Sequence, residues 1–219
     1  MKDHSKFIEK KVFQINGIPF FISLLPENRY LLSCAMEEQN PWKTLASDVK
    51  YDNNWIRVTE HQVINPSGGT GIYGEVHFKN FAIGILPLDE EQNTWLVGQY
   101  RFPLKAYSWE IPEGGGQFHE DPLESARREL VEETGLSAKN WKEIQRMHLS
   151  NSVSDELNII YLATDLIQGI AMPEETEQLL VKKLPFEEVY QMVLSGEITD
   201  SVSVAAILKV KLMILNGEI

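Results

Sequence analysis

Alternating apolar and polar positions predict that the first part of the chain is built from β-strands. Residues 11–25, KVFQINGIPFFISLL, place Asn16-Gly17 between two apolar runs, which is a strong signal for a β-hairpin. Another strand is expected over residues 29–36, and a polar segment ending in Pro41 indicates a boundary near residue 40. Two more strand-like runs within residues 55–78 flank a turn at residues 65–69.

The pattern changes in the second half of the chain, where strands and helices both appear. The apolar runs at 82–88, 94–102 and 157–163 predict buried strands of a sheet. A helix is predicted from Asp121 as the N-cap, with Pro122 first in the helix, Glu124 completing a capping box and Gly135 ending it. Two amphipathic helices are expected over residues 186–194 and 201–215. This order predicts an α+β fold with an α/β/α sandwich on a mixed sheet.

The helix after Asp121 carries an unusual set of acidic side chains. At about 100° per residue, Glu129, Glu132 and Glu133 share one sector beside the apolar stripe. Like charges at this spacing repel each other, and Arg128 can pair with only one of them. The helix alone would be typical of a solvated charged face. The alternative is that the carboxylates bind a hard divalent cation such as Mg²⁺ or Mn²⁺.

The residues around this helix favour the cation. The segment from Gly114 to Leu136 resembles the Nudix box of the Nudix hydrolase superfamily. It holds the fixed residues of that box at their fixed spacing: Gly114, Glu120, Arg128, Glu129, Leu130, Glu132, Glu133, Gly135 and Leu136. The resemblance implies a Nudix-type α/β/α sandwich and metal-dependent chemistry on diphosphate bonds.

Three further segments resemble the ADP-ribose pyrophosphatase branch of this superfamily. They are RFP at residues 101–103, WEIPEGG at 109–115 and SVSDE at 152–156, and the likeness extends over roughly residues 42–210. The branch implies a nucleoside diphosphate linked to another moiety as the substrate, with compounds like ADP-ribose first. A non-catalytic nucleotide-sugar sensor and a hydrolase for GDP-mannose or a dinucleotide are the alternatives.

The resemblance also implies a metal site and a general base. The main-chain carbonyl of Glu113, together with Glu129 and Glu133, is expected to bind Mg²⁺, with Mn²⁺ as a possible substitute. Glu132 is the expected third carboxylate, shared between the metal and Arg128. Glu156 is expected to deprotonate the attacking water, and Glu133 is the rival base.

Three residues outside the box are candidates for substrate binding. Arg101 is expected to clamp phosphate oxygens, or else to pair with an acid on the surface. Glu110 is expected to bind a metal-bridging water or a substrate hydroxyl, or else to face solvent from a strand. Trp55 is a candidate to stack on a base, although packing in the core is the more common role for a tryptophan.

Charge and composition exclude several classes of function. The formal net charge of −12 over 219 residues disfavours binding to nucleic acid, which relies on clustered Lys and Arg. No apolar run reaches the roughly 20 residues that a membrane span needs. The single cysteine, Cys34, excludes an internal disulfide and favours a cytoplasmic location. It also lies outside the Nudix-like region, which disfavours an isopentenyl diphosphate isomerase.

Together these features predict a β-rich N-terminal extension over residues 1–40 and a Nudix hydrolase domain over residues 41–219. The expected reaction is hydrolysis of the diphosphate bond, giving AMP and a sugar phosphate from an ADP-sugar. The resemblance to the ADP-ribose branch also implies a homodimer.

Overall fold

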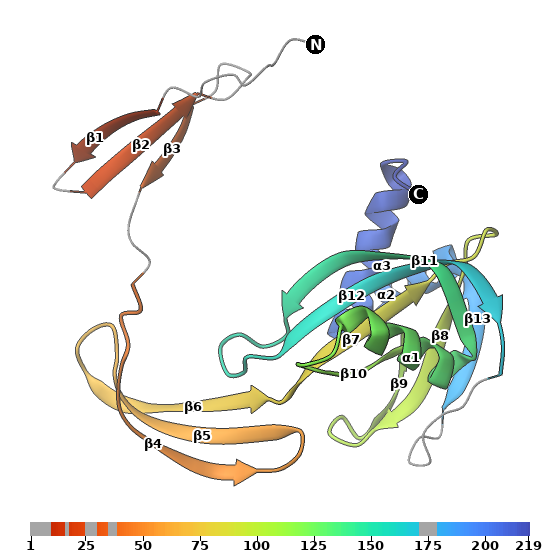
Figure 1. Cartoon of the computed structure of the whole chain (residues 1–219), viewed down its shortest axis with the longest axis horizontal. Helices are drawn as coiled ribbons and strands as arrows, with labels where there is room; N and C mark the ends of the chain where they lie inside the picture. The colour runs from red at the N-terminus through yellow and green to blue at the C-terminus, as the bar shows by residue number, and fades with distance from the viewer. Residues whose placement is uncertain (1–9, 16–17, 25–29, 35–38, 171–178) are drawn as a thin grey trace. The chain divides into compact units, whose positions relative to one another are not determined.

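The computed structural model describes residues 10–15, 18–24, 30–34, 39–170 and 179–219, and over residues 10–34 it describes only the course of the backbone. Within these residues the chain forms thirteen strands and three helices (Figure 1). It divides into two compact units, residues 1–44 with 63–71 and residues 45–62 with 72–219.

The N-terminal strands form a sheet of their own. β1 (Lys10–Ile15), β2 (Ile18–Leu24) and β3 (Tyr30–Cys34) pair antiparallel in the order β1-β2-β3. The pairing of Ile15 with Ile18 confirms the predicted hairpin. Its turn residues, Asn16 and Gly17, lie outside the described residues.

A second three-stranded sheet contains β4 (Lys43–Asp52), β5 (Ile56–Ile64) and β6 (Thr70–Phe78) in that order. The two strands predicted within residues 55–78 are thus confirmed. The sequence pattern gave no sign of β4, because all ten of its residues are exposed and no buried stripe marks it.

The sheet that positions the site is mixed, with the order β10-β7-β12-β11. β7 (Asn80–Pro87) and β12 (Leu157–Gln168) run parallel at its centre. β10 (Glu113–Gln117) and β11 (Leu136–His148) pair antiparallel at its two edges. A separate sheet holds β13 (Leu180–Pro185), β8 (Asn93–Arg101) and β9 (Ala106–Glu110) in the order β13-β8-β9. The buried runs at 82–88 and 94–102 therefore lie in different sheets.

The three helices begin and end close to the predicted residues. α1 (Pro122–Thr134) is capped by Asp121, whose side chain accepts the N–H of Leu123, and it ends at Gly135 with φ of 72°. The predicted capping box is wrong, because the carboxylate of Glu124 accepts a hydrogen bond from Arg127 instead. α2 (Phe186–Leu194) and α3 (Ser201–Leu215) confirm the two C-terminal helices.

Helices cover both faces of the mixed sheet, which confirms the predicted sandwich (Figure 1). Side chains alternate along β7, so that Ile83 and Ile85 pack with Leu130 of α1. Leu86 points the other way and packs in the cluster that contains Ile207 of α3. Among the described residues, no helix is both long and apolar enough to span a bilayer.

Candidate active site

A cavity of about 410 Å³ lies where the mixed sheet meets the N-terminus of α3. Its walls come from elements that are far apart in the sequence, including β6, β7, β8, β10 and the loop before β12. The residues that matter below are Trp55, Phe78, Arg101, Glu113, Gly114, Glu156 and Asp200. The fold thus brings four ionisable side chains and three aromatic side chains, including Phe81, to one cavity.

Two carboxylates of α1 converge on the backbone at the start of β10. Glu133 is 3% exposed, and its Oε2 accepts the N–H of Glu113 at 3.0 Å. The carboxylate of Glu129 lies against Gly114, where a Cβ atom would overlap it. The predicted grouping of Glu113, Glu129 and Glu133 is therefore present, and it depends on a glycine at position 114.

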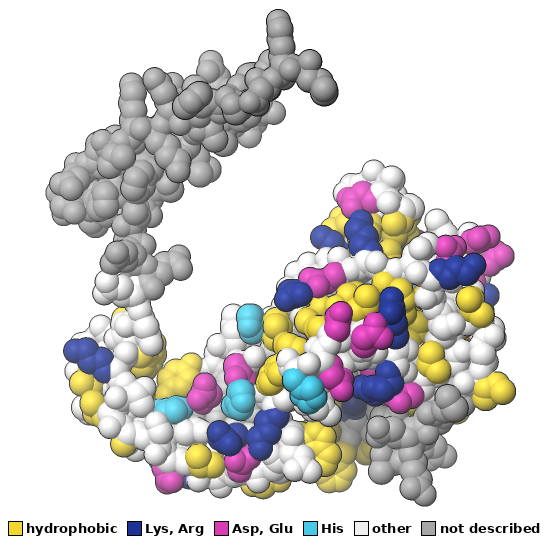
Figure 2. Space-filling model, viewed as in Figure 1, with side chains coloured by type: hydrophobic (Ala, Val, Ile, Leu, Met, Phe, Trp, Pro, Cys, Tyr) yellow, Lys and Arg dark blue, Asp and Glu magenta, His cyan; other side chains and the backbone are white. Residues whose placement is uncertain are grey.

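Arg128 ties the acidic helix to β10. Its guanidinium donates to Glu132 Oε2 at 2.8 Å and to the carbonyl of Gly115 at 2.9 Å. The same group lies 2.9 Å from Glu129 Oε1. The predicted pair of Arg128 with Glu132 is present, and acidic and basic side chains lie side by side on the face that carries α1 (Figure 2).

Arg101 is held by two glutamates at the cavity. Its Nε donates to Glu110 at 3.0 and 3.1 Å, and its Nη2 lies 2.7 Å from Glu113 Oε1. Glu110 is 2% exposed, so the alternative that it faces solvent is wrong. Burial acts to raise the pKa of Glu110, but the hydrogen bonds and charge of Arg101 outweigh burial and lower that pKa. Arg101 therefore has an acid partner and also lines the cavity.

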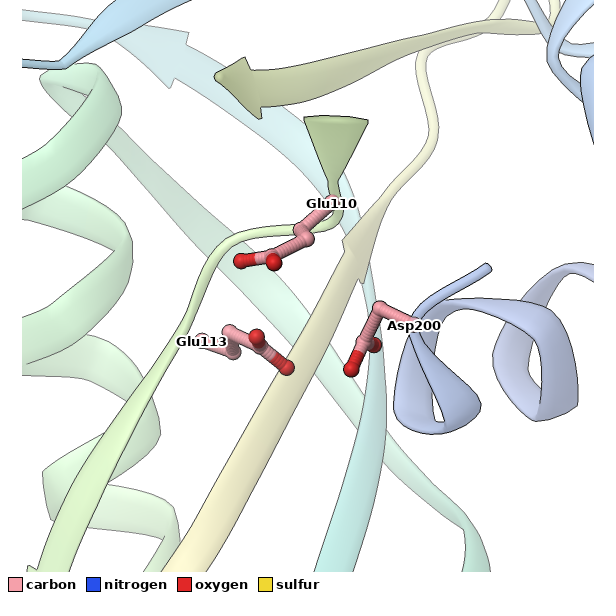
Figure 3. A group of neighbouring side chains, drawn as sticks. All are labelled: Glu110, Glu113 and Asp200. Atoms are coloured by element: carbon pink, nitrogen blue, oxygen red, sulfur yellow. The ribbon is translucent and has the colours of Figure 1, made fainter. Parts of the chain in front are cut away.

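Asp200 completes a group of three carboxylates that the sequence analysis did not predict. Glu110, Glu113 and Asp200 point toward one another, with an oxygen of each within 4.8 Å of the others (Figure 3). Burial, and next the charge of Asp200, raises the pKa of Glu113 well above its usual value. Asp200 also caps α3, since its Oδ2 accepts the N–H of Ser203 at 2.7 Å. No spacing in the sequence links it to the glutamates.

Glu156 lines the cavity from the loop before β12, and its role as a base stays a prediction. Its main-chain carbonyl accepts the N–H of Leu149 at 3.3 Å, which closes this loop. Burial, followed by the charge of neighbouring Asp155, raises the pKa of the Glu156 carboxyl. A base with a raised pKa is a stronger proton acceptor near neutral pH.

Trp55 lines the same cavity and is 65% exposed, so the interpretation that it packs in the core is wrong. Trp95, in contrast, is 8% exposed and lies in the core on the α1 side of the sheet. An exposed tryptophan at a cavity leaves the predicted stacking on a base open.

Comparison with known proteins shows which family the segment with the acidic helix and the glycine-rich strand belongs to. Residues 79–202 match the family model described as the NUDIX domain. The chain belongs to the NUDIX family. The Nudix match includes α1, β10 and the loop of Glu156, and residues 42–76 match the nucleoside diphosphate sugar hydrolase N-terminal domain.

Curated relatives that match most of this Nudix chain include two ADP-ribose pyrophosphatases. An ADP-ribose pyrophosphatase of Mycobacterium tuberculosis is 31% identical over 78% of this chain and 84% of the relative. An ADP-ribose pyrophosphatase of Bacillus subtilis is 29% identical over 75% of this chain and 90% of the relative. A crystal structure of an ADP compounds hydrolase matches with a TM-score of 0.74 and 18% identity, over 84% of this chain and all of that one. The structural match confirms the Nudix α+β fold.

The donor set on α1 and β10 fits the divalent cation that the Nudix family uses. Glu129 and Glu133 supply carboxylate oxygens beside the backbone of Glu113 and Gly114. Such hard oxygen donors suit Mg²⁺ and Mn²⁺. Glu132 is engaged by Arg128, and its share in the metal site stays a prediction.

We expect Gly114→Ala to lower kcat by at least 10-fold, because its methyl group would displace the Glu129 carboxylate that lies there. Steady-state kinetics at saturating Mg²⁺ measure the effect. Gly71→Ala is the matched control, since a Cβ atom at Gly71 meets no atom within 4 Å. Equal activity of the two variants would show that catalysis does not require the Glu129 carboxylate to lie against Gly114.

Proposed function

We propose that this Nudix protein hydrolyses the diphosphate bond of a nucleoside diphosphate linked to a sugar, with ADP-ribose as the first candidate. The observation that carries the proposal is the cavity that joins Arg101, Glu156 and the start of β10 next to the acidic helix α1. The names of the relatives support the substrate class. The expected products of ADP-ribose are AMP and ribose 5-phosphate.

In the proposed reaction, a water oxygen attacks one phosphorus of the diphosphate in line with the bridging oxygen. The new bond joins the water oxygen to phosphorus, and the bond from phosphorus to the bridging oxygen breaks. Glu156 takes the proton of the water, which its raised pKa favours. The leaving group is the other phosphate monoester. Glu133 is the alternative base, although it already accepts the N–H of Glu113.

The remaining chain residues bind and orient the substrate in this proposal. Arg101, which is fixed in direction by Glu110, offers its guanidinium to phosphate oxygens in the cavity. Glu110 acts mainly by holding Arg101, since it is buried against that side chain. Trp55 supplies a flat apolar surface for the nucleobase. Arg128 is a positioning residue, because it fixes Glu129 and Glu132 relative to β10.

Mg²⁺ or Mn²⁺ bound by Glu129, Glu133 and the carbonyl of Glu113, with Glu132 nearby, would neutralise the diphosphate charge and make phosphorus easier to attack. The chain itself holds these donors in place through Arg128 and through the N–H of Glu113. This arrangement also explains how an acidic protein binds an anionic substrate.

We further propose that the protein is a homodimer. Large apolar side chains are exposed on β4 and on the β8–β9 hairpin, and they include Leu45, Val49, Tyr100 and Leu104. Exposed apolar area of this kind marks surfaces that bind other proteins. The extension over residues 1–40, the Nudix domain over residues 41–219 and the cytoplasmic location stay predictions from the sequence.

The function is tested by incubating the full chain with ADP-ribose, GDP-mannose, UDP-glucose, NADH and a diadenosine polyphosphate, each with Mg²⁺ and with Mn²⁺. We expect the highest kcat/KM for ADP-ribose, with AMP and ribose 5-phosphate released in equal amounts. A higher value for another compound would reassign the substrate within the same reaction. Binding of ADP-ribose with no cleavage of any compound would favour the sensor and contradict the proposal.

A further inference from the structure

Asp155, next to the proposed base, is bound to β6 through both of its carboxylate oxygens. Oδ1 accepts the N–H of Phe78 at 2.9 Å, and Oδ2 lies 2.5 Å from Nδ1 of His77. Burial acts to raise the pKa of Asp155, but the hydrogen bonds from His77 and Phe78 outweigh burial and lower it. The side chain is therefore an ionised acceptor at neutral pH.

The main chain joins the same two segments. The N–H of Val76 donates to the carbonyl of Val153 at 2.8 Å, and the N–H of Asp155 donates to the carbonyl of Val76 at 3.3 Å. The hydroxyl of Tyr73 donates to the carbonyl of Ser152 at 2.6 Å. We call this set of contacts between β6 and residues 152–155 the β6 clasp. It ends one residue before Glu156, and it includes the amide of Phe78, which lines the cavity.

We infer that Asp155 is a positioning residue for the hydrolysis. Its carboxylate is fixed to β6, and this attachment holds the adjacent Glu156 against the cavity. This inference rests on the proposed function, because it assigns Asp155 a role only through Glu156. A loop is otherwise free to move its side chains by an ångström or more, and a shift of that size at a base costs about 10²-fold in rate.

Because the β6 clasp is exposed, a positioning role of Asp155 can be distinguished from a role in the stability of the fold. The side chains of His77 and Asp155 are 41% and 45% exposed, and surface pairs of this kind contribute little to the free energy of unfolding. Removal of the Asp155 carboxylate should therefore leave the fold intact, while residue 155 keeps only its main-chain hydrogen bond to β6 and gains freedom to move. A residue with only a structural role would lower the melting temperature and leave kcat per folded molecule unchanged.

The test is a double-mutant cycle with Asp155→Ala and Glu156→Gln in the full chain, assayed with ADP-ribose and Mg²⁺. We expect Asp155→Ala to lower kcat by roughly 10- to 100-fold, with KM changed by about twofold or less. In the Glu156→Gln background the same change should lower kcat by about twofold or less, because the base is already lost. Asp155→Asn keeps an acceptor for the N–H of Phe78 and should restore part of kcat.

Glu143→Ala is the matched control, since it removes an exposed carboxylate that pairs with Arg146 on β11. We expect its kcat to equal that of the wild type. An unchanged kcat in Asp155→Ala, or an equal loss in both backgrounds, would overturn the inference while leaving the hydrolase assignment intact. If Glu156→Gln itself keeps full kcat, the base assignment fails first, and the role of Asp155 fails with it.

Discussion

We expect Glu133→Gln to lower kcat by about 10³-fold or more at saturating Mg²⁺, because removal of one carboxylate from the acidic helix costs several kcal/mol of transition-state stabilisation. The variant should fold normally. Glu133 accepts the N–H of Glu113, and the amide oxygen of glutamine can accept the same hydrogen bond. Stopped assays of ADP-ribose cleavage measure the loss, and thermal unfolding checks the fold.

Glu124→Gln is the control for this substitution. It makes the same change on the same helix, at a carboxylate that pairs with exposed Arg127 and lies outside the cavity. Its kcat should match that of the wild type. Unchanged turnover in Glu133→Gln would refute the metal role of α1.

We expect Glu156→Gln to lower kcat by about 10²- to 10⁴-fold with a smaller change in KM, because an amide cannot take the proton of the attacking water. The pH dependence gives a second readout. The pKa of Glu156 is raised above its ordinary 4.5, and the base works only when ionised. In the wild type kcat/KM should therefore fall as the pH drops through this raised pKa. The variant should lack that acidic limb.

An effect of Glu156→Gln on KM alone would move the base role to Glu133. The pH profiles of kcat/KM for the wild type and Glu156→Gln would show such a change of base, because the acidic limb would then persist in Glu156→Gln. Glu143→Gln, at an exposed carboxylate paired with Arg146, controls for the loss of charge alone.

The parts of the fold that the sequence predicted are those with a strong local pattern. α1 has a capping aspartate, a proline at its first position and a terminal glycine in the left-handed conformation, so both ends were predictable. β7 and β12 are continuous apolar runs because helices cover both of their faces.

The missed strands lack such a pattern. β10 is EGGGQ, which reads as a loop from its glycines and forms a strand only because it pairs with β7. β11 alternates poorly, and its register shifts between Glu143 and Gln145. Pairing partners far along the chain therefore determine these strands, and local propensity does not reveal them.

The site residues also fall into two groups, those that a local sequence pattern brings together and those that only the tertiary fold brings together. Glu129, Glu132, Glu133 and Arg128 lie on one helix, so helical periodicity alone predicted that they meet. Asp200 meets Glu110 and Glu113 only through the packing of α3 against the sheet, and His77 meets Asp155 only through the pairing of β6 with a loop. No periodicity connects such positions, so only the tertiary fold brings them together.

In the proposed mechanism, carboxylates of α1 bind divalent cations that the reaction requires. Isothermal titration of Mn²⁺ into the full chain, with a non-hydrolysable α,β-methylene analogue of ADP-ribose present, tests it most directly. We predict saturable uptake by the wild type and by Glu124→Gln, and its loss in a Glu129→Gln, Glu133→Gln double variant. Equal uptake by the double variant and the wild type, or no uptake by either, would contradict a metal site on α1.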